Sequence, residues 1–149
     1  MAQAAGNDNG KVLREVEEAF GQVPTWMRAL PPEGVAGFWT MFRDVELAET
    51  KIPNKYKELI GLAVSGATRC RYCTLFHTEA ARLHGATDAE IAEASLMAGV
   101  TMCASTFLNA EQTDHETFAR ETREIVAYVR KQQQRGQVQS KGKEQHARS

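Results

Sequence analysis

The sequence predicts an all-α protein, a bundle of about six helices joined by short connections. Apolar residues recur at helical spacing along most of the chain. No run alternates apolar and polar residues between turn residues, which is the usual mark of a strand. A chain of 149 residues is one domain by length and is long enough to bury a core.

The first part of the chain predicts three helical segments separated by glycine or proline. The first covers residues 11–20 and ends at Gly21, a residue common just beyond helix ends. The second covers residues 26–30, before a proline pair. The third runs from residue 33 to about residue 48, and its apolar stripe is expected to face the core through Val35, Phe38, Trp39 and Phe42.

The middle of the chain predicts two consecutive helices. Pro53 suits the first position of a helix. The residues that follow are apolar nearly all round, so this helix is expected to be central and buried. The next helix covers residues 71–84 and stops at Gly85.

The last part of the chain predicts two more helices. Thr87 with Glu90 three residues later forms a capping box, which opens a helix to about Asn109. Asp114 starts the final helix, which passes through Tyr128.

The composition of the chain predicts three segments and a cytoplasmic location. Residues 1–10 are expected to be a flexible N-terminus, residues 11–130 the domain, and residues 131–149 a basic, disordered tail. The body is acidic, so no nucleic-acid partner is expected. With neither a signal peptide nor a long apolar run in sight, we expect a cytoplasmic protein without a membrane partner.

The residues that carry chemistry gather in one short segment. Cys70 and Cys73 stand two residues apart, and His77 follows four residues after Cys73, on the same helical face. In a reducing compartment such a cysteine pair is redox-active or binds metal. The first turn of a helix and a nearby imidazole both favour a thiolate. Cys73 is therefore the better-supported nucleophile and Cys70 the resolving thiol, although the reverse assignment stays open.

Glu58 is the fourth candidate, and two interpretations of it stay open. It lies in an otherwise apolar helix, where a buried carboxylate needs a partner. If the two helices form a hairpin, Glu58 faces His77 and helps to move protons. Otherwise it is a partly exposed residue in the second turn of its helix.

The pattern Glu58-x11-Cys70-x2-Cys73-x3-His77 resembles the signature of the alkylhydroperoxidase D-like (AhpD-like) branch of the carboxymuconolactone decarboxylase superfamily. The resemblance covers residues 53–107. It implies an AhpD-like helical fold that assembles as a trimer or hexamer. It also implies a peroxidase or dithiol-disulfide oxidoreductase that acts on alkyl hydroperoxides.

The resemblance assigns a role to each residue. Cys73 is the attacking thiolate, Cys70 its disulfide partner, and Glu58 with His77 the proton relay. The electron donor is a lipoyl protein, a thioredoxin-like protein or a peroxiredoxin partner. Some relatives carry a second histidine inside or beside the dithiol, whereas in this chain Tyr72 occupies the position before Cys73. No cofactor and no metal are expected.

Other interpretations compete with this one. Cys70, Cys73 and His77, with Glu58 or water, are a possible zinc set in a non-catalytic scaffold, although a second ligand pair is missing. The lactone decarboxylase reaction is a further alternative, but it does not depend on a Cys-x-x-Cys pair. Cys103 is expected to be a buried core thiol. His84, at the end of its helix, is either near the site or in solvent.

Overall fold

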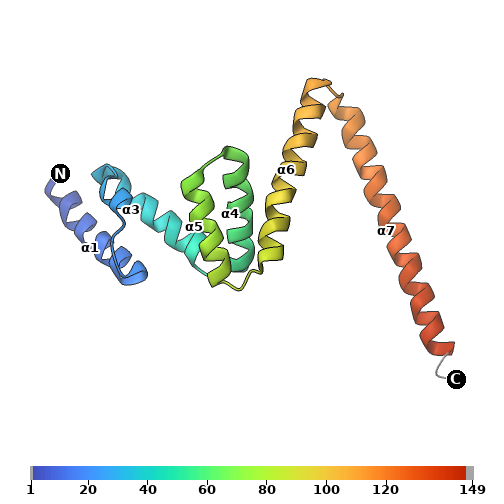
Figure 1. Cartoon of the computed structure of the whole chain (residues 1–149), viewed down its shortest axis with the longest axis horizontal. Coiled ribbons are helices and arrows are strands. Elements are labelled where there is room, and N and C mark those ends of the chain that lie inside the picture. Colours follow the sequence, from blue (N-terminus) through green and yellow to red (C-terminus); the bar gives the residue numbers. More distant parts are fainter. Residues whose placement is uncertain (1, 147–149) are drawn as a thin grey trace. The chain divides into compact units, whose positions relative to one another are not determined.

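The computed structural model describes residues 2–146, with side chains described for residues 9–136. This part of the chain contains seven α-helices, one π-helix and no strand, which confirms the all-α class (Figure 1). The helices are α1 (Ala2–Phe20), α2 (Thr25–Arg28), α3 (Pro32–Met41), the π-helix η1 (Phe42–Leu47), α4 (Asn54–Thr68), α5 (Arg71–Leu83), α6 (Asp88–Ala110) and α7 (His115–His146).

The N-terminal helices share a small hydrophobic core. Gly21 follows α1 with a positive φ of 72°, and its N–H donates to Glu17 (2.8 Å), so α1 ends where the sequence predicts. The chain then returns through α2 to α3, which packs against α1. The core consists of Val12, Val16, Val23, Met27, Val35 and Trp39.

The segment predicted as one helix over residues 33–48 is two different helices. After Met41 the backbone widens into the π-helix η1, in which the N–H of Ala48 donates to the carbonyl of Arg43 (2.9 Å). Apolar spacing alone does not distinguish the two kinds of turn. Because π-helical turns are rare and often occur at functional sites, η1 indicates that a functional site lies nearby.

Helices α4 and α5 form a tight antiparallel hairpin (Figure 1). The expectation that α4 is buried on all sides is wrong. Only Asn54, Glu58, Leu62 and Ser65 are buried, whereas large apolar side chains on its other faces are exposed. The main contacts of α4 are with α5 and η1, and they leave its other faces exposed.

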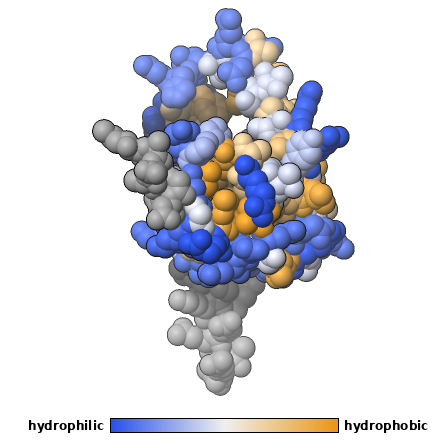
Figure 2. Space-filling view, turned by 90° about the vertical axis from the view of Figure 1, so that its left-hand side faces the viewer, coloured by the Kyte–Doolittle hydropathy of each residue, from blue (hydrophilic) through white to orange (hydrophobic). Residues whose placement is uncertain are grey.

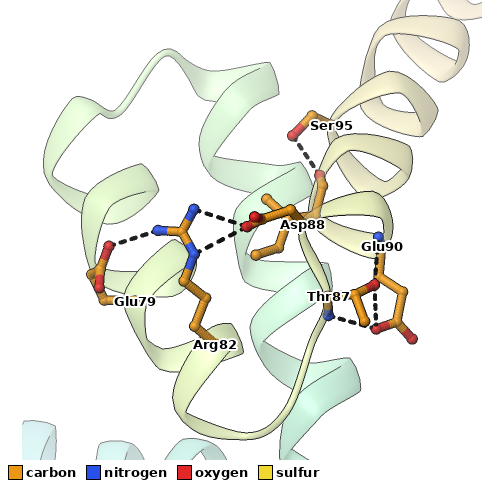
Figure 3. Close-up of polar contacts among 7 residues, drawn as sticks. Glu79, Arg82, Thr87, Asp88, Glu90 and Ser95 are labelled. Atoms are coloured by element: carbon orange, nitrogen blue, oxygen red, sulfur yellow. Dashed lines mark hydrogen bonds and ion pairs between the residues drawn. The ribbon is translucent and has the colours of Figure 1, made fainter.

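The turn between α5 and α6 contains the predicted capping box (Figure 3). The N–H of Thr87 donates to the Glu90 carboxylate (2.8 Å), and the N–H of Glu90 donates to the Thr87 hydroxyl (3.2 Å). Gly85 precedes it with a φ of 81°, as expected for a helix stop. Arg82 spans the turn, with Asp88 at 3.1 Å and Glu79 at 3.0 Å.

The chain divides into two compact units, Met1–Val100 and Thr101–Ser149, which are described separately. In the first unit, the start of α6 exposes Leu96, Met97 and Val100; in the second, the end of α6 and the described part of α7 expose apolar side chains along their length. Figure 2 shows one face of the molecule, where hydrophobic side chains reach the surface between hydrophilic ones. Cys103 is exposed, so the expectation of a buried thiol is wrong.

Helix α6 also corrects the expectation about apolar runs. Helix Asp88–Ala110 is 23 residues long. Its most apolar stretch has a mean hydropathy of 1.4, and none of that stretch is buried. By length and composition this helix is able to cross a membrane, although one such helix is weak evidence that it does.

Both ends of the described chain are helical. Helix α1 begins at Ala2, and α7 continues to His146. The side chains of residues 1–8 and 137–149, that of His146 among them, lie outside the described residues. The division into a flexible N-terminus, a domain and a disordered tail stays a prediction.

Candidate active site

Cys70 lies in the two-residue turn between α4 and α5, and Cys73 lies in the first turn of α5. Helix α4 ends with Arg69 in the left-handed conformation (φ 58°), which turns the chain sharply. The N–H of Cys70 then donates to the carbonyl of Ser65 (3.0 Å). Cys70 is the N-cap of α5, and its sulfur accepts a hydrogen bond from the N–H of Cys73 (3.3 Å). The local backbone therefore delivers both cysteines to the positive end of α5.

The two cysteines are joined by a disulfide, with their Cα atoms 5.4 Å apart. Cys73 is exposed, whereas Cys70 is only partly so. Greater access favours Cys73 as the residue that meets a substrate first. Tyr72 between them is 72% exposed, and its hydroxyl accepts a hydrogen bond from the Arg71 guanidinium (2.8 Å).

A buried carboxylate holds the histidine of the site. The Oε2 atom of Glu58 lies 2.8 Å from Nδ1 of His77, and Glu58 is 1% exposed. Of the two interpretations of Glu58, the one in which it faces His77 is therefore confirmed. A buried carboxylate bonded to one imidazole nitrogen fixes the orientation of the ring and supports a proton on that nitrogen.

Gly61 makes this contact geometrically possible. It lies one helical turn after Glu58 on α4, and a Cβ atom built there would overlap the imidazole atoms of His77. The ring therefore rests directly on the backbone of α4. The Ser65 hydroxyl, buried one turn further along, donates to the Gly61 carbonyl (2.6 Å).

A second carboxylate in the site has no counterpart among the sequence predictions. Glu46, on η1, places Oε1 3.7 Å from Nδ1 of His77. Burial raises the pKa of the Glu46 carboxyl; the charge of His77 partly offsets this, and the charge of Glu58 adds to it. The only hint in the sequence is an acidic residue between Val45 and Leu47 near a helix end. The tertiary contact itself has no sequence signature.

Several predicted or considered residues lie apart from this cluster. Among the described residues, no hydrogen bond joins His77 to Cys70 or Cys73. His84 is exposed at the end of α5, and Cys103 is exposed on α6. The catalytic roles of the four predicted residues stay predictions.

The cluster also bears on metal binding. The ligand atoms of Glu46, Glu58 and His77 all lie within 4.8 Å of one another. In the part of the chain that is described, this group contains neither cysteine. The zinc set considered from the sequence is therefore not assembled in the disulfide form.

Comparison with known proteins gives one family match. A model of the carboxymuconolactone decarboxylase family matches residues 33–116, which is more than half of the chain and includes every residue of the site. None of the curated protein sequences compared with the chain matches it.

Two crystal structures resemble the chain in sequence and fold. One is the alkylhydroperoxidase AhpD core of Rhodospirillum rubrum, with 29% identity and a TM-score of 0.66 over 75% of this chain and 86% of that chain. The other is a protein of Methanobacterium thermoautotrophicum, with 34% identity and a TM-score of 0.51 over 58% of this chain and 96% of that chain.

Proposed function

The chain belongs to the carboxymuconolactone decarboxylase family, with an AhpD-like fold, and we propose that it is a thiol-dependent peroxidase and dithiol-disulfide oxidoreductase. One observation carries the proposal. A cysteine pair with an exposed Cys73 begins the same helix that carries a histidine bonded to a buried carboxylate. A neighbouring base that activates a thiol is the usual arrangement of nucleophilic cysteine chemistry.

In the proposed cycle, the thiolate of Cys73 attacks the O–O bond of an alkyl hydroperoxide. Cys73 becomes a sulfenic acid, and the departing alkoxide takes a proton from His77 and leaves as an alcohol. The thiol of Cys70 then attacks the sulfenic sulfur, which releases water and forms the Cys70–Cys73 disulfide. An external dithiol returns two electrons and two protons by exchange.

The parts of the site suit these steps. His77 lies one turn along α5 from Cys73. In the proposed cycle it exchanges a proton with Cys73 directly or through one water molecule. Glu58 stabilises the imidazolium that forms when His77 takes a proton. Tyr72 and His84, both exposed, have no role in the proposal.

Counting thiols tests this proposal. A Cys103→Ser variant removes the exposed thiol outside the site, so the reduced protein has two titratable thiols, Cys70 and Cys73. One equivalent of cumene hydroperoxide is expected to remove both thiols rapidly. In the same background, the Cys73→Ser variant is expected to lose its Cys70 thiol only at the rate of the uncatalysed reaction with peroxide.

The other outcomes are informative. Two thiols that survive the peroxide reject the peroxidase activity. If the oxidised protein, which already contains the Cys70–Cys73 disulfide, is nevertheless reduced rapidly by dihydrolipoamide, the protein is a disulfide oxidoreductase only. Inertness in both reactions favours the lactone decarboxylase or the zinc-binding scaffold, which metal titration of the reduced protein separates.

We further propose that the chain forms a homo-oligomer, a trimer or hexamer. Leu96 and Val100 lie one turn apart on α6 and are 67% and 54% exposed, an apolar surface that favours a protein contact. Light scattering is expected to show an oligomer in the wild type and a smaller species in Leu96→Glu/Val100→Glu. The exposed Glu93→Gln variant is the control.

The same chemistry supports a cytoplasmic location. A dithiol that cycles with peroxide needs a compartment that keeps thiols reduced. A lipoyl protein, a thioredoxin-like protein or a peroxiredoxin partner would supply the electrons. The thiol assay with each donor as reductant distinguishes them.

A further inference from the structure

Two carboxylates converge on one nitrogen of one imidazole. Nδ1 of His77 has Oε2 of Glu58 at 2.8 Å and Oε1 of Glu46 at 3.7 Å. The two acids come from different elements, Glu58 from α4 and Glu46 from η1. The proposed thiol chemistry uses Glu58 but leaves Glu46 without a role.

The position of Glu46 is held by neighbouring side chains. The Lys57 ammonium donates to the carbonyls of Val45 and Ala48, each at 2.6 Å, on either side of Glu46. The buried side chain of Asn54 donates to the Leu47 carbonyl at 2.8 Å. Helix α4 therefore secures three of the four backbone carbonyls from residue 45 to residue 48.

An aromatic contact joins the start of η1 to α5. The rings of Phe42 and Phe76 are 5.8 Å apart, and Phe76 precedes His77 in the chain. Helix η1 is thus tied to α4 by hydrogen bonds and to α5 by an aromatic pair. Glu46 is held against His77 from both sides.

The Glu46 carboxylate faces the His77 ring. Its Oε1 atom is buried and accepts no hydrogen bond from the described residues. Nδ1 of His77 lies at ion-pair distance from that oxygen. The exposed fractions of the side chains rise from 2% in Glu58 to 16% in His77 and 28% in Glu46, so the cluster opens to solvent at Glu46.

We propose that Glu46 is a positioning residue for His77: together with Glu58 it holds a proton on Nδ1 and leaves Nε2 as the nitrogen that exchanges protons in the dithiol cycle. This inference rests on the proposed function for its catalytic meaning. Negative charge beside Nδ1 favours the Nδ1–H tautomer over the Nε2–H tautomer. It also stabilises the imidazolium that forms when Nε2 takes a proton.

The charges that face Glu46 set the pH range of this effect. Glu58 and Lys57 approach it from α4, and His77 from α5. Because burial raises the pKa of Glu46, its charge is lost on acidification at a higher pH than that of an ordinary glutamate. The effect on His77 is therefore fully present only above that raised pKa.

Nitrogen NMR of the full-length, oxidised protein tests the inference directly. The ¹⁵N shifts of His77, assigned with His77→Asn, report its tautomer. Glu46→Gln keeps the size of the side chain and removes the charge. It is expected to increase the population of the Nε2–H tautomer.

Two further variants make the test specific. Glu46→Asp keeps the charge and is expected to retain most of the wild-type Nδ1–H tautomer. Glu49→Gln removes a charge three residues away on an exposed side chain and is expected to leave the tautomer unchanged. A Glu46→Gln protein whose His77 tautomer matches that of Glu49→Gln overturns the inference.

The result is independent of the proposed function. The NMR readout needs no peroxide, reductant or thiol, so inert cysteines do not affect it. In an active protein, Glu46→Gln is expected to slow thiol oxidation, and Glu46→Asp to restore most of the rate. A Glu46→Gln protein that oxidises its thiols at the wild-type rate rejects the role of Glu46 in the cycle and leaves the thiol chemistry intact.

Discussion

The imidazole of His77 occupies the space where a side chain on Gly61 would begin. Gly61 therefore provides a flat stretch of α4 backbone, one turn beyond Glu58, on which the ring rests. Any other residue there must displace the histidine or shift α5 away from α4. The glycine is thus as much a part of the site as the carboxylate.

Gly61→Ala is expected to impair activity far more than folding. The methyl group overlaps the His77 ring, and a displacement of about 1 Å lowers catalysis by about 10-fold to 100-fold. Alanine gains about 1 kcal/mol of helix propensity, which offsets part of the overlap in the free energy of unfolding. Thiol oxidation rates and urea denaturation measure the two effects.

Gly66→Ala is the matched control on the same helix. A Cβ atom at Gly66 meets nothing within 4 Å. This variant is expected to keep the wild-type rate and to gain about 0.5–1 kcal/mol of stability. Equal activity in Gly61→Ala and Gly66→Ala would show that the position of His77 does not matter.

Glu58→Gln is expected to slow peroxide-driven thiol oxidation by about 10-fold or more, because His77 loses the charged partner that stabilises its protonated form. The amide fills the same buried space, so the helical circular dichroism should be unchanged. Glu93→Gln, an exposed change on α6, is the control. A Glu58→Gln enzyme with wild-type rates across the pH range would remove Glu58 from the relay.

The Lys55–Glu90 ion pair predicts how stability changes with acid. Hydrogen bonds from Lys55, and then from Thr87, lower the pKa of Glu90 to about 2, against an ordinary value of 4.5. A lowered pKa in the folded state means that the contribution is complete above pH 4.5 and disappears as the pH falls towards 2. The melting temperature is therefore expected to fall through this range.

Glu90→Gln checks that assignment. It is expected to flatten the part of the pH dependence that comes from this pair, whereas Glu93→Gln on the same helix keeps the wild-type slope. Melting temperatures at half-unit steps between pH 2 and pH 6 measure the difference. Parallel curves for Glu90→Gln and the wild type would mean that the pair has no effect on folding.

Asn54→Ala is expected to destabilise the protein by about 1–2 kcal/mol. The buried amide is the hydrogen-bond donor to the Leu47 carbonyl, and its removal leaves that carbonyl without the bond at the end of η1. Lys51→Ala, at an exposed position, is the control. A free energy of unfolding equal to that of the control, measured in urea, would contradict this account of η1.

Local signals explain what could be predicted from the sequence. Gly21 and Gly85 end helices at positive φ, and Thr87 with Glu90 forms a capping box, because each depends on residues within a few positions. The contact between Glu58 and His77 was one of two open interpretations, and it follows from the hairpin of α4 and α5.

The remaining features depend on tertiary structure. Glu46 reaches His77 only because a π-helical turn and the side chain of Lys57 place it there. Burial was predicted wrongly for α4 and Cys103, because periodicity identifies an apolar face but not what covers it. The role of Gly61 depends on the His77 ring, which approaches from another helix.

The spacing of the cysteines separates the chemistry of the protein from its folding. The Cys70–Cys73 bond closes a loop of only three sequence steps, and the loop-entropy contribution of a disulfide falls as the loop shortens. The Arg69 turn and the N-cap bond of Cys70 already hold this segment in place through the backbone. Opening and closing the disulfide is therefore expected to leave most of the free energy of unfolding unchanged, so the proposed redox cycle would not work against the stability of the helices.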